Sequence, residues 1–480
     1  MLFNSIEFAL FLPIVFLFYW LLKKSRQSQN ILLLVASYVF YGWWDWRFLS
    51  LIAFSSVVDY SIGIGLLSNN EKKRKLLLWT SIVVNLGILG VFKYYNFFLD
   101  SFIDAFKWFG MEFSVSRLNI ILPVGISFYT FQTLSYSIDV YRRKMEPSRD
   151  IISFFTFVSF FPQLVAGPIE RASHLLPQFH KKRIFDYKLA SDGTRQILWG
   201  LFKKVVIADN CALLVNDIFE NYEIFNGVTL VLGAFYFAIQ IYCDFSGYSD
   251  IAIGTARLFG FDLMQNFAFP YFSRNIGEFW RRWHISLSTW FRDYLYIPLG
   301  GSRGTMYKKI RNTVIIFLVS GFWHGANWTF IWWGAINAIY FLPLLIAGNN
   351  RNYVDVAAEN KFFASFKEFG QILLTFGLVC FAWIFFRAEN ITHAWDYIFG
   401  IGQRAFENPG QPLLFLSKSV NIFIVLLVVI EWFHRSKRHG LQIDKTISSQ
   451  IVRSVIYLSL ALFIVLMATK TDASFIYFQF

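Results

Sequence analysis

Long runs of apolar residues constrain the fold of this chain more than any other feature. A helix needs about 20 apolar residues to cross the hydrocarbon core of a bilayer, and stretches such as 48–67 and 76–98 reach that length. Only 16% of the residues are charged and the mean hydropathy is +0.46, whereas a soluble domain carries about 25% charged residues. The sequence therefore predicts an all-α polytopic membrane protein, with residues 1–480 forming a single integral membrane domain.

The spacing of these runs sets the expected number of spans. We expect about ten to twelve transmembrane helices. Residues 151–166 are apolar but short and interrupted by Pro162, which predicts a re-entrant helix covered by neighbouring protein. Residues 262–311 are polar yet rich in aromatic side chains, which predicts helices in the interface or lining a cavity. Besides the two runs named above, the apolar stretches are 6–22, 31–46, 118–140, 228–258, a pair within 313–346, 371–386, 420–432 and 451–467.

The basic residues predict the orientation of the chain. The formal net charge is +13, and Lys and Arg cluster between apolar runs, as in 72–75 and 435–438. Such clusters beside apolar spans are typical of cytoplasmic loops that face anionic lipid. We therefore expect membrane lipids and no nucleic acid as partners, and the parity of the spans places the N-terminus outside. The first lysine, Lys23, follows the first apolar run, which predicts an uncleaved span rather than a secretory signal.

His324 is the residue that most needs a chemical reason. It lies within the apolar run 312–346, where an ionisable side chain is costly and indicates a functional site. At helical spacing, Ser320 and Asn327 share its face, so both are candidates to stabilise an oxyanion. A GxxxG pattern beginning at Gly321 favours close approach of another helix. The alternative is a structural histidine that bonds to a carbonyl of a neighbouring helix.

Two further groups place polar side chains among aromatic or apolar residues. His284 follows Arg281 and Arg282, an arginine pair suited to the phosphates of a donor or to anionic lipid. The alternative is an interfacial helix anchored by tryptophans. Asp244 precedes Tyr248 by one turn inside an apolar run, so it should face a wet cavity or pair with a cation. It would then orient a histidine or hold a cationic partner, with Arg281 or Arg282 as the plainer choice.

The chain ends in the aromatic segment 475–480. This segment is an interfacial anchor, a docking peptide, or the carrier of a transient acyl group on the hydroxyl of Tyr477. The three cysteines are far apart and form no CxxC pattern, so neither a disulfide framework nor a metal site is expected. The sequence also lacks a Walker-type phosphate loop, a GxSxG elbow and an HExxH helix, which excludes the families defined by those motifs.

Five stretches together resemble the membrane-bound O-acyltransferase family, in particular its bacterial alginate and exopolysaccharide O-acetyltransferases. They are highly specific as a set, and the resemblance covers essentially the whole chain. The stretches are Leu122-Pro-Val-Gly-Ile-Ser-Phe-Tyr129, Phe161-Pro-Gln-Leu-Val-Ala-Gly-Pro-Ile-Glu170, Asp244-Phe-Ser-Gly-Tyr-Ser-Asp250, Phe279-Trp-Arg-Arg-Trp-His284 and Gly321-Phe-Trp-His-Gly325.

The resemblance implies a ring of tilted helices around a central funnel and tunnel, in the inner membrane of a bacterium. It implies that His324 and His284 are the family's two site histidines. No bound cofactor is expected. An acyl group, acetyl or D-alanyl, would pass from a cytoplasmic thioester such as acetyl-CoA to an acceptor outside. An extracytoplasmic partner of the SGNH type and a polysaccharide as final acceptor are implied as well.

The resulting hypothesis makes His324 a general base for the acceptor hydroxyl, which attacks the thioester carbonyl. Two other classes of function stay open on the sequence. Buried Asp59, Asp244, Asp250 and His324 are the kind of residues that line a proton path in a transporter. The second open class of function is a non-catalytic scaffold for an envelope-polymer synthase.

Overall fold

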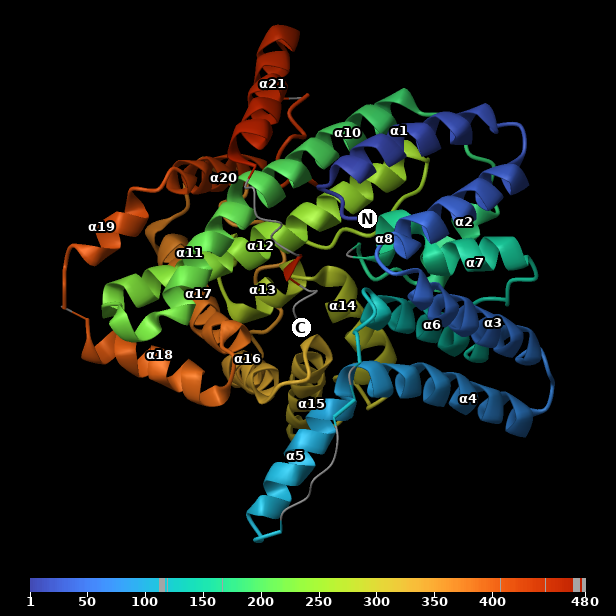
Figure 1. Cartoon of the computed structure of the whole chain (residues 1–480), viewed down its shortest axis with the longest axis horizontal. Helices are drawn as coiled ribbons and strands as arrows, with labels where there is room; N and C mark the ends of the chain where they lie inside the picture. The colour runs from blue at the N-terminus through green and yellow to red at the C-terminus, as the bar shows by residue number, and fades with distance from the viewer. Residues whose placement is uncertain are drawn as a thin grey trace. The chain divides into compact units, whose positions relative to one another are not determined.

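The computed structural model of the chain describes residues 1–111, 117–118, 120–165, 167–405, 407–444, 446–468 and 475–476. All regular secondary structure in these residues is helical, which confirms the predicted all-α fold. The chain divides into two compact units (Figure 1). Unit 1 comprises Met1–Ala190 and Thr255–Met264, and unit 2 comprises Ser191–Gly254 and Gln265–Phe480. The single domain expected over residues 1–480 stays a prediction.

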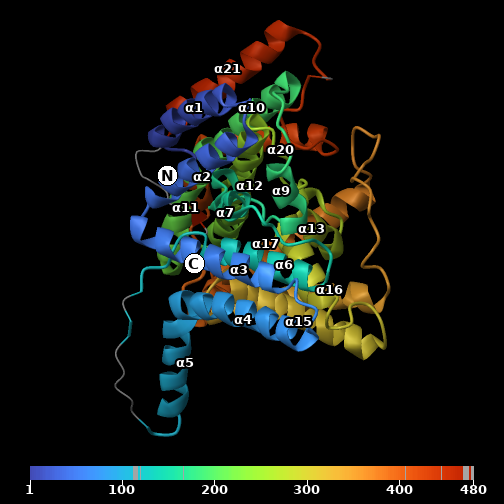
Figure 2. The same cartoon turned by 90° about the vertical axis from the view of Figure 1, so that its right-hand side faces the viewer.

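Unit 1 is a set of helices that pack around α6. Its α3 and α4 contact α6, and α2 contacts both α1 and α7. Figure 2 shows α5 leaving the end of α4 in a new direction, at a π-helical turn of the kind that kinks helices. The helices are α1 (Ile6–Leu21), α2 (Arg26–Gly42), α3 (Leu49–Gly65), α4 (Glu71–Leu89), α5 (Tyr95–Lys107), α6 (Ile126–Tyr141), α7 (Ile151–Ser159), α8 (Phe161–Leu164) and α9 (Ala172–Phe179).

Asp59 shows how unit 1 satisfies a buried carboxylate. It lies on α3 and accepts hydrogen bonds from Ser81 at 2.6 Å, Asn85 at 2.8 Å and Ser137 at 2.8 Å. Three neutral donors thus take the place of the cation or wet cavity expected from the sequence. Because a buried polar group with its hydrogen bonds made is stable without further partners, Asp59 ties α3 to α4 and α6 and has a structural role.

Unit 2 contains the long helix α12, whose most apolar 18-residue stretch is 78% buried. The neighbouring helix α10 reaches it through glycines, because a Cβ at Gly200 would lie 2.5 Å from the carbonyl oxygen of Gly247. The helices are α10 (Tyr187–Leu201), α11 (Asp209–Glu220), α12 (Gly227–Leu258), α13 (Ile276–Arg282), α14 (Ile285–Phe291), α15 (Met306–His324), α16 (Trp328–Ile346), α17 (Phe366–Arg387), α18 (Ile391–Gln403), α19 (Gln411–Leu416), α20 (Val420–His434) and α21 (Gln450–Met467).

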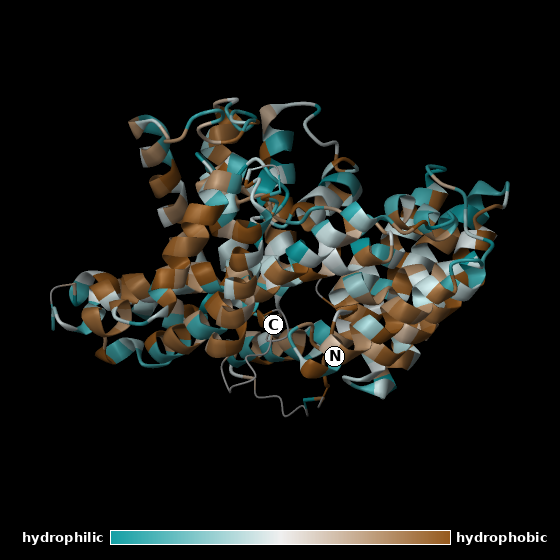
Figure 3. Cartoon of the chain, turned by 90° about the horizontal axis from the view of Figure 1, so that it is seen from above, coloured by the Kyte–Doolittle hydropathy of each residue, from teal (hydrophilic) through white to brown (hydrophobic). Residues whose placement is uncertain are grey.

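The helices carry the apolar surface that a bilayer requires. Within the described residues, six helical segments are long and apolar enough to cross a membrane, and three shorter helices are apolar as well. Figure 3 shows hydrophobic residues along most helices and hydrophilic residues gathered in the connecting segments. In α21 only 6% of the apolar stretch is buried by protein, and so large an exposed apolar surface is typical of a membrane or interaction surface. The protein is therefore a polytopic membrane protein, whereas the ten to twelve spans and the ring around a funnel stay predictions.

Candidate active site

His324 is the last residue of α15, and the helix ends there because Gly325 is extended. The predicted helix face shared by His324 and Asn327 is therefore wrong. Asn327 instead caps α16: its Oδ1 accepts from the backbone N–H of Thr329 at 3.0 Å, and its Nδ2 donates to the carbonyl oxygen of Glu389 at 2.8 Å. Since both ends of this amide are engaged, we withdraw Asn327 as an oxyanion donor.

Glycines bring α15 and α16 together as a tight hairpin. A Cβ at Gly321 would collide with the carbonyl oxygen of Phe330, and one at Gly334 would collide with that of Phe317. The close helix approach predicted at Gly321 is thus confirmed, with α16 as the partner. This contact fixes the end of α15 and so the position of His324 (3% exposed).

His284 lies at the corner between α13 and α14. Its backbone is left-handed, with φ 43° and ψ 54°, a conformation that costs an L-residue about 1–2 kcal/mol. Such strain persists only where the surroundings impose it, commonly at active sites. The side chain is 1% exposed, and burial lowers the pKa of His284 to about 3. The imidazole is therefore neutral at physiological pH.

The two histidines expected from the sequence lie together in unit 2. Their ring centroids are 6.4 Å apart. Aromatic rings surround His324, with Trp323 at 5.0 Å, Trp333 at 5.1 Å and Phe386 at 5.3 Å between centroids. An apolar lining of this kind strengthens local electrostatic interactions. The pair is suited to proton transfer at one reacting centre.

Asp244 pairs with a cation that the sequence reasoning did not identify. Its Oδ1 lies 2.8 Å from Nζ of Lys204, which also contacts Asp209 at 2.8 Å. The expected pairing with Arg281 or Arg282 is therefore wrong. The neighbouring carboxylate on α12 has a similar partner, since Asp250 lies 2.6 Å from Lys203. Both carboxylates on α12 are thus held in ion pairs with lysines.

The aromatic tail reaches this buried carboxylate. The backbone N–H of Ile476 donates to Oδ2 of Asp244 at 2.8 Å, and the ring of Phe475 lies 4.3 Å from that of Tyr248. Phe475 and Ile476 are both buried. Asp244 and Tyr248 thus hold the chain end rather than a histidine, and the predicted acyl carrier Tyr477 lies outside the described residues.

Arg281 and Arg282 support a loop rather than an open binding site. Arg281 donates to the carbonyl oxygens of Asn350, Asn352 and Tyr353 at 2.6–3.0 Å. Arg282 donates to the carbonyl oxygen of Asp355 at 2.6 Å and forms an ion pair with Glu278 at 2.9 Å. Because these guanidinium groups are engaged by protein, the prediction that they bind the donor is corrected to a structural role.

Unit 2 contains a cavity of about 550 Å³, and neither His284 nor His324 is among the residues that line it. Two of its lining residues flank the pair: Ser320 is one turn before His324 on α15, and Ser288 is one turn after His284 on α14. Ser320 thus lies on the helix of His324 as expected, and its predicted oxyanion role stays a prediction. The rest of the lining is largely apolar and aromatic, including Trp280, Phe291, Ile316, Phe317, Phe341 and Leu345.

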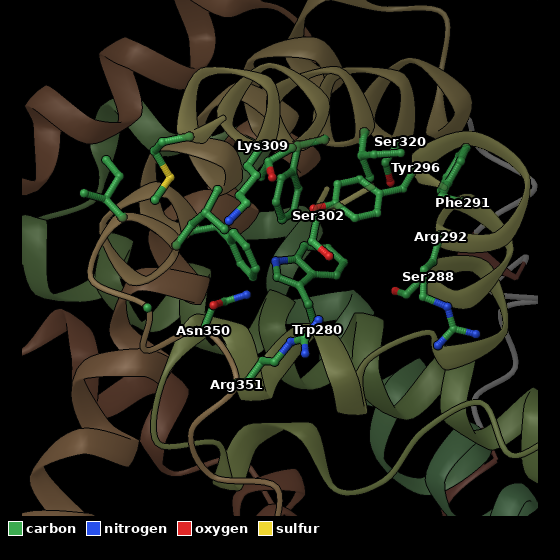
Figure 4. A pocket seen from close by; sticks show the side chains of 18 of the residues that line it. Trp280, Ser288, Phe291, Arg292, Tyr296, Ser302, Lys309, Ser320, Asn350 and Arg351 are labelled. Carbon is green, nitrogen blue, oxygen red and sulfur yellow. The ribbon is translucent and has the colours of Figure 1, made fainter. Parts of the chain in front are cut away.

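Charged groups border the same cavity. Lys309, Asn350 and Arg351 lie on one side in Figure 4, and Ser288 and Ser320 lie on the other. Arg292 also lines the cavity but contacts Asp293 at 2.7 Å. The cavity thus has a basic side and a side that carries Ser288 and Ser320, with largely apolar walls between them. Sequence reasoning missed Lys309 because a basic cluster beside an apolar span looks like any cytoplasmic loop, and it missed Arg351 because that residue is a single basic side chain in a polar segment.

The chain is similar in sequence to known proteins. Residues 138–354 match the profile of the membrane-bound O-acyltransferase (MBOAT) family. The chain is 43% identical over 398 residues to a probable alginate O-acetylase of Pseudomonas aeruginosa, covering 82% of this chain and 74% of that protein. It is 36% identical over 456 residues to a peptidoglycan O-acetyltransferase of Helicobacter pylori (88% and 83%). A teichoic acid D-alanyltransferase of Bacillus subtilis is 26% identical over 295 residues (57% and 71%).

Proposed function

The chain belongs to the membrane-bound O-acyltransferase family and is a membrane O-acyltransferase, and on that premise we propose that it moves an acetyl group from a cytoplasmic thioester to a hydroxyl of an extracytoplasmic polysaccharide. The observation that carries this proposal is the pair of buried histidine rings 6.4 Å apart, each one helical turn from a serine, Ser288 or Ser320, that lines a cavity of about 550 Å³. Acetyl is favoured over D-alanyl because the relatives named O-acetylase or O-acetyltransferase share 36–43% identity, against 26% and 31% over shorter alignments for two D-alanyltransferases.

His324 acts as the general base in this proposal. It takes the proton of the acceptor hydroxyl while the hydroxyl oxygen forms a bond to the acyl carbon. The carbon–sulfur bond then breaks, and the proton ends on the leaving sulfur. A positioned imidazole accelerates such a transfer by about 10²–10⁴-fold. Ser320 is placed on the same helix one turn away and stabilises the oxyanion.

The donor is a thioester such as acetyl-CoA, bound in the cavity as a substrate. Phosphates would lie near Lys309 and Arg351, and the thioester would lie toward Ser288 and Ser320 on the side of the histidines. The largely apolar walls between these sides suit an extended pantetheine chain, since ligand pockets combine apolar walls with a few polar groups. Cations recognise phosphate by charge and hydrogen bonding.

We expect Lys309→Ala and Arg351→Ala each to raise KM for acetyl-CoA about tenfold, the equivalent of about 1.4 kcal/mol, with a smaller change in kcat. The physical reason is the loss of a phosphate contact that is made in both ground state and transition state. Steady-state kinetics in detergent or vesicles measures the effect. Lys308→Ala is the matched control, because that neighbouring lysine does not line the cavity. Unchanged KM in both variants would place the donor elsewhere.

The tail supplies the acyl carrier in the proposed route. Phe475 and Ile476 lie against Tyr248 and Asp244, and Phe245 contacts both Phe475 and the His284 ring, at 5.9 Å and 4.7 Å. The next residue along the chain is Tyr477. Its hydroxyl would take the acetyl group as an ester and pass it on, in the manner of covalent catalysis.

We expect acetylated Tyr477 to be found by mass spectrometry of protein that is quenched during turnover. Tyr477→Phe should abolish both this adduct and the transfer to the polysaccharide, because phenylalanine keeps the aromatic ring but lacks the accepting oxygen. Phe478→Tyr, made together with Tyr477→Phe, is the control for position, because it moves the hydroxyl to the next residue along the chain. Full transfer by Tyr477→Phe, with no adduct in the unaltered protein, would leave the tail a docking role only.

The proposed route crosses the bacterial inner membrane with the N-terminus outside. An extracytoplasmic partner of the SGNH type would receive the acetyl group and deliver it to the polysaccharide. Membrane lipids cover the apolar helices. No resident cofactor takes part in the proposed chemistry, because the thioester itself activates the acyl group.

Reconstituted vesicles provide the test of the function. Labelled acetyl-CoA is added outside protein-containing vesicles, with alginate oligosaccharide or a soluble peptidoglycan fragment enclosed within, with and without the SGNH-type partner. We expect label to appear on Tyr477 without the partner and on the enclosed saccharide with it. If label were transferred from a D-alanyl thioester and not from acetyl-CoA, the acyl group would be assigned as D-alanyl instead of acetyl. Failure of both thioesters to transfer label would overturn the proposal.

A further inference from the structure

One buried residue, Asn266, holds the loop that carries His284. Its backbone oxygen accepts from the N–H of Ile285 at 2.9 Å. Its side-chain Oδ1 lies 3.0 Å from Nδ1 of His284 and accepts from the hydroxyl of Ser286 at 2.9 Å. On its other side, Nδ2 donates to the hydroxyl of Ser249 at 3.0 Å. Asn266 is fully buried, and the acyl transfer described above makes no use of it.

The hydrogen bonds determine which end of the Asn266 amide faces the histidine. The backbone N–H of Ser286 approaches the same side-chain atom at 3.4 Å. A backbone N–H only donates, so that atom must be the amide oxygen. An amide oxygen only accepts, and Nδ1 of His284 must therefore carry the hydrogen. In a neutral imidazole the other nitrogen, Nε2, then carries the lone pair.

We propose that Asn266 is a positioning residue that fixes His284 in the Nδ1–H tautomer, so that Nε2 faces the reaction as a hydrogen-bond and proton acceptor. Asn266 acts through His284 and touches no substrate. The strained left-handed backbone of His284 supports this role. Such strain persists only where surrounding groups hold it, and Asn266 holds this loop through hydrogen bonds of both its own backbone and its own side chain.

This inference rests on the proposed acyl transfer, and it specifies which ring nitrogen of His284 donates a hydrogen bond and which accepts one. In the reaction, the acceptor O–H bond breaks, its oxygen bonds to the acyl carbon, and the carbon–sulfur bond breaks. In the inferred tautomer, Nε2 of His284 accepts a hydrogen bond from the group that holds the moving proton before the proton reaches sulfur. Neutral His284 does not donate from Nε2, so it is not the donor that stabilises the oxyanion.

The test combines ring ¹⁵N NMR of the full-length protein in micelles with acyl-transfer kinetics. Protein labelled at the histidine rings is compared with His284→Gln, which identifies the signals of His284. We expect the spectrum to show that Nδ1 of His284 carries a hydrogen and that Nε2 does not. Asn266→Leu should lose this preference and lower kcat about a hundredfold, on the scale of a proton-transfer contribution, with KM for acetyl-CoA nearly unchanged. Asn266→Asp keeps an accepting oxygen and should restore the tautomer and most of kcat.

Gln265→Leu is the matched control, because this neighbouring amide bonds to the carbonyl oxygen of Phe267 at 2.8 Å and not to His284. It should leave both the spectrum and kcat unchanged. A proton on Nε2 in the unaltered protein, or an unchanged tautomer and kcat in Asn266→Leu, would overturn the inference. The spectrum is read without any substrate, so a failure of the proposed acyl transfer is distinguished from a failure of the tautomer assignment.

Discussion

Replacing His324 with alanine is expected to lower the rate of acyl transfer by about 10²–10⁴-fold, the contribution of a positioned general base. The ring is 3% exposed and lies 6.4 Å from that of His284, so water has little room to take over the proton transfer. The loss should appear in kcat, because the imidazole acts on the proton of the acceptor and does not hold the phosphates of the donor. Initial rates with labelled acetyl-CoA measure it.

A folding defect has to be distinguished from this chemical loss. His324→Gln keeps most of the side-chain volume among Trp323, Trp333 and Phe386, so it should fold while losing the same activity. His434→Ala is the matched control, since that histidine bonds only to the carbonyl of Ile430 in its own helix among the contacts described, at 2.9 Å. Retention of normal kcat by His324→Gln in well-folded protein would remove His324 from the chemistry.

The fold and the two histidines could be predicted because each depends on a local signal. Apolar runs as long as a bilayer is thick predict helices wherever they occur, and α12, α17 and α21 follow them closely. Shorter amphipathic helices such as α18 have no such run, and they were not predicted. His324 was found because a titratable residue is rare in an apolar run. Its meeting with His284 depends on tertiary packing, which the spacing along the chain does not contain.

The partners of the polar residues were harder to predict. Asn327 was assigned to the face of His324 because helical periodicity was continued past Gly325, where the structure breaks the helix. Arg281 and Arg282 looked available, yet loop carbonyls of 350–355 engage them. In each case a hydrogen-bond partner distant in sequence decides the role. Buried polar groups nearly always have such a partner, but a single sequence does not identify it.

Lys204 is another residue whose partners the sequence did not identify, and replacing it is expected to have a large effect on stability. It lies on the π-helix η3 (Phe202–Ala208), only 1% exposed. Two carboxylates, Asp209 and Asp244, each lie 2.8 Å from its Nζ. Lys204→Met would leave them buried together without their cation. Removing one partner of a buried ion pair costs about 3–5 kcal/mol, and we expect a loss of that size in the free energy of unfolding, measured in detergent micelles.

The loss in the free energy of unfolding should arise because the ion pair is buried, not because a lysine is replaced. Lys107→Met makes the same change in an exposed pair with Asp104, where the side chains are 61% and 75% exposed, and an exposed pair contributes about 0–1 kcal/mol. Adding Asp209→Asn to Lys204→Met removes one uncompensated charge and should recover part of the stability. Equal losses in Lys204→Met and Lys107→Met would show that the buried cluster is not held by charge. The tail should respond as well, because Asp244 accepts the hydrogen bond of Ile476. A disturbed Asp244 should therefore expose residues 475–476 to proteases before the helices unfold.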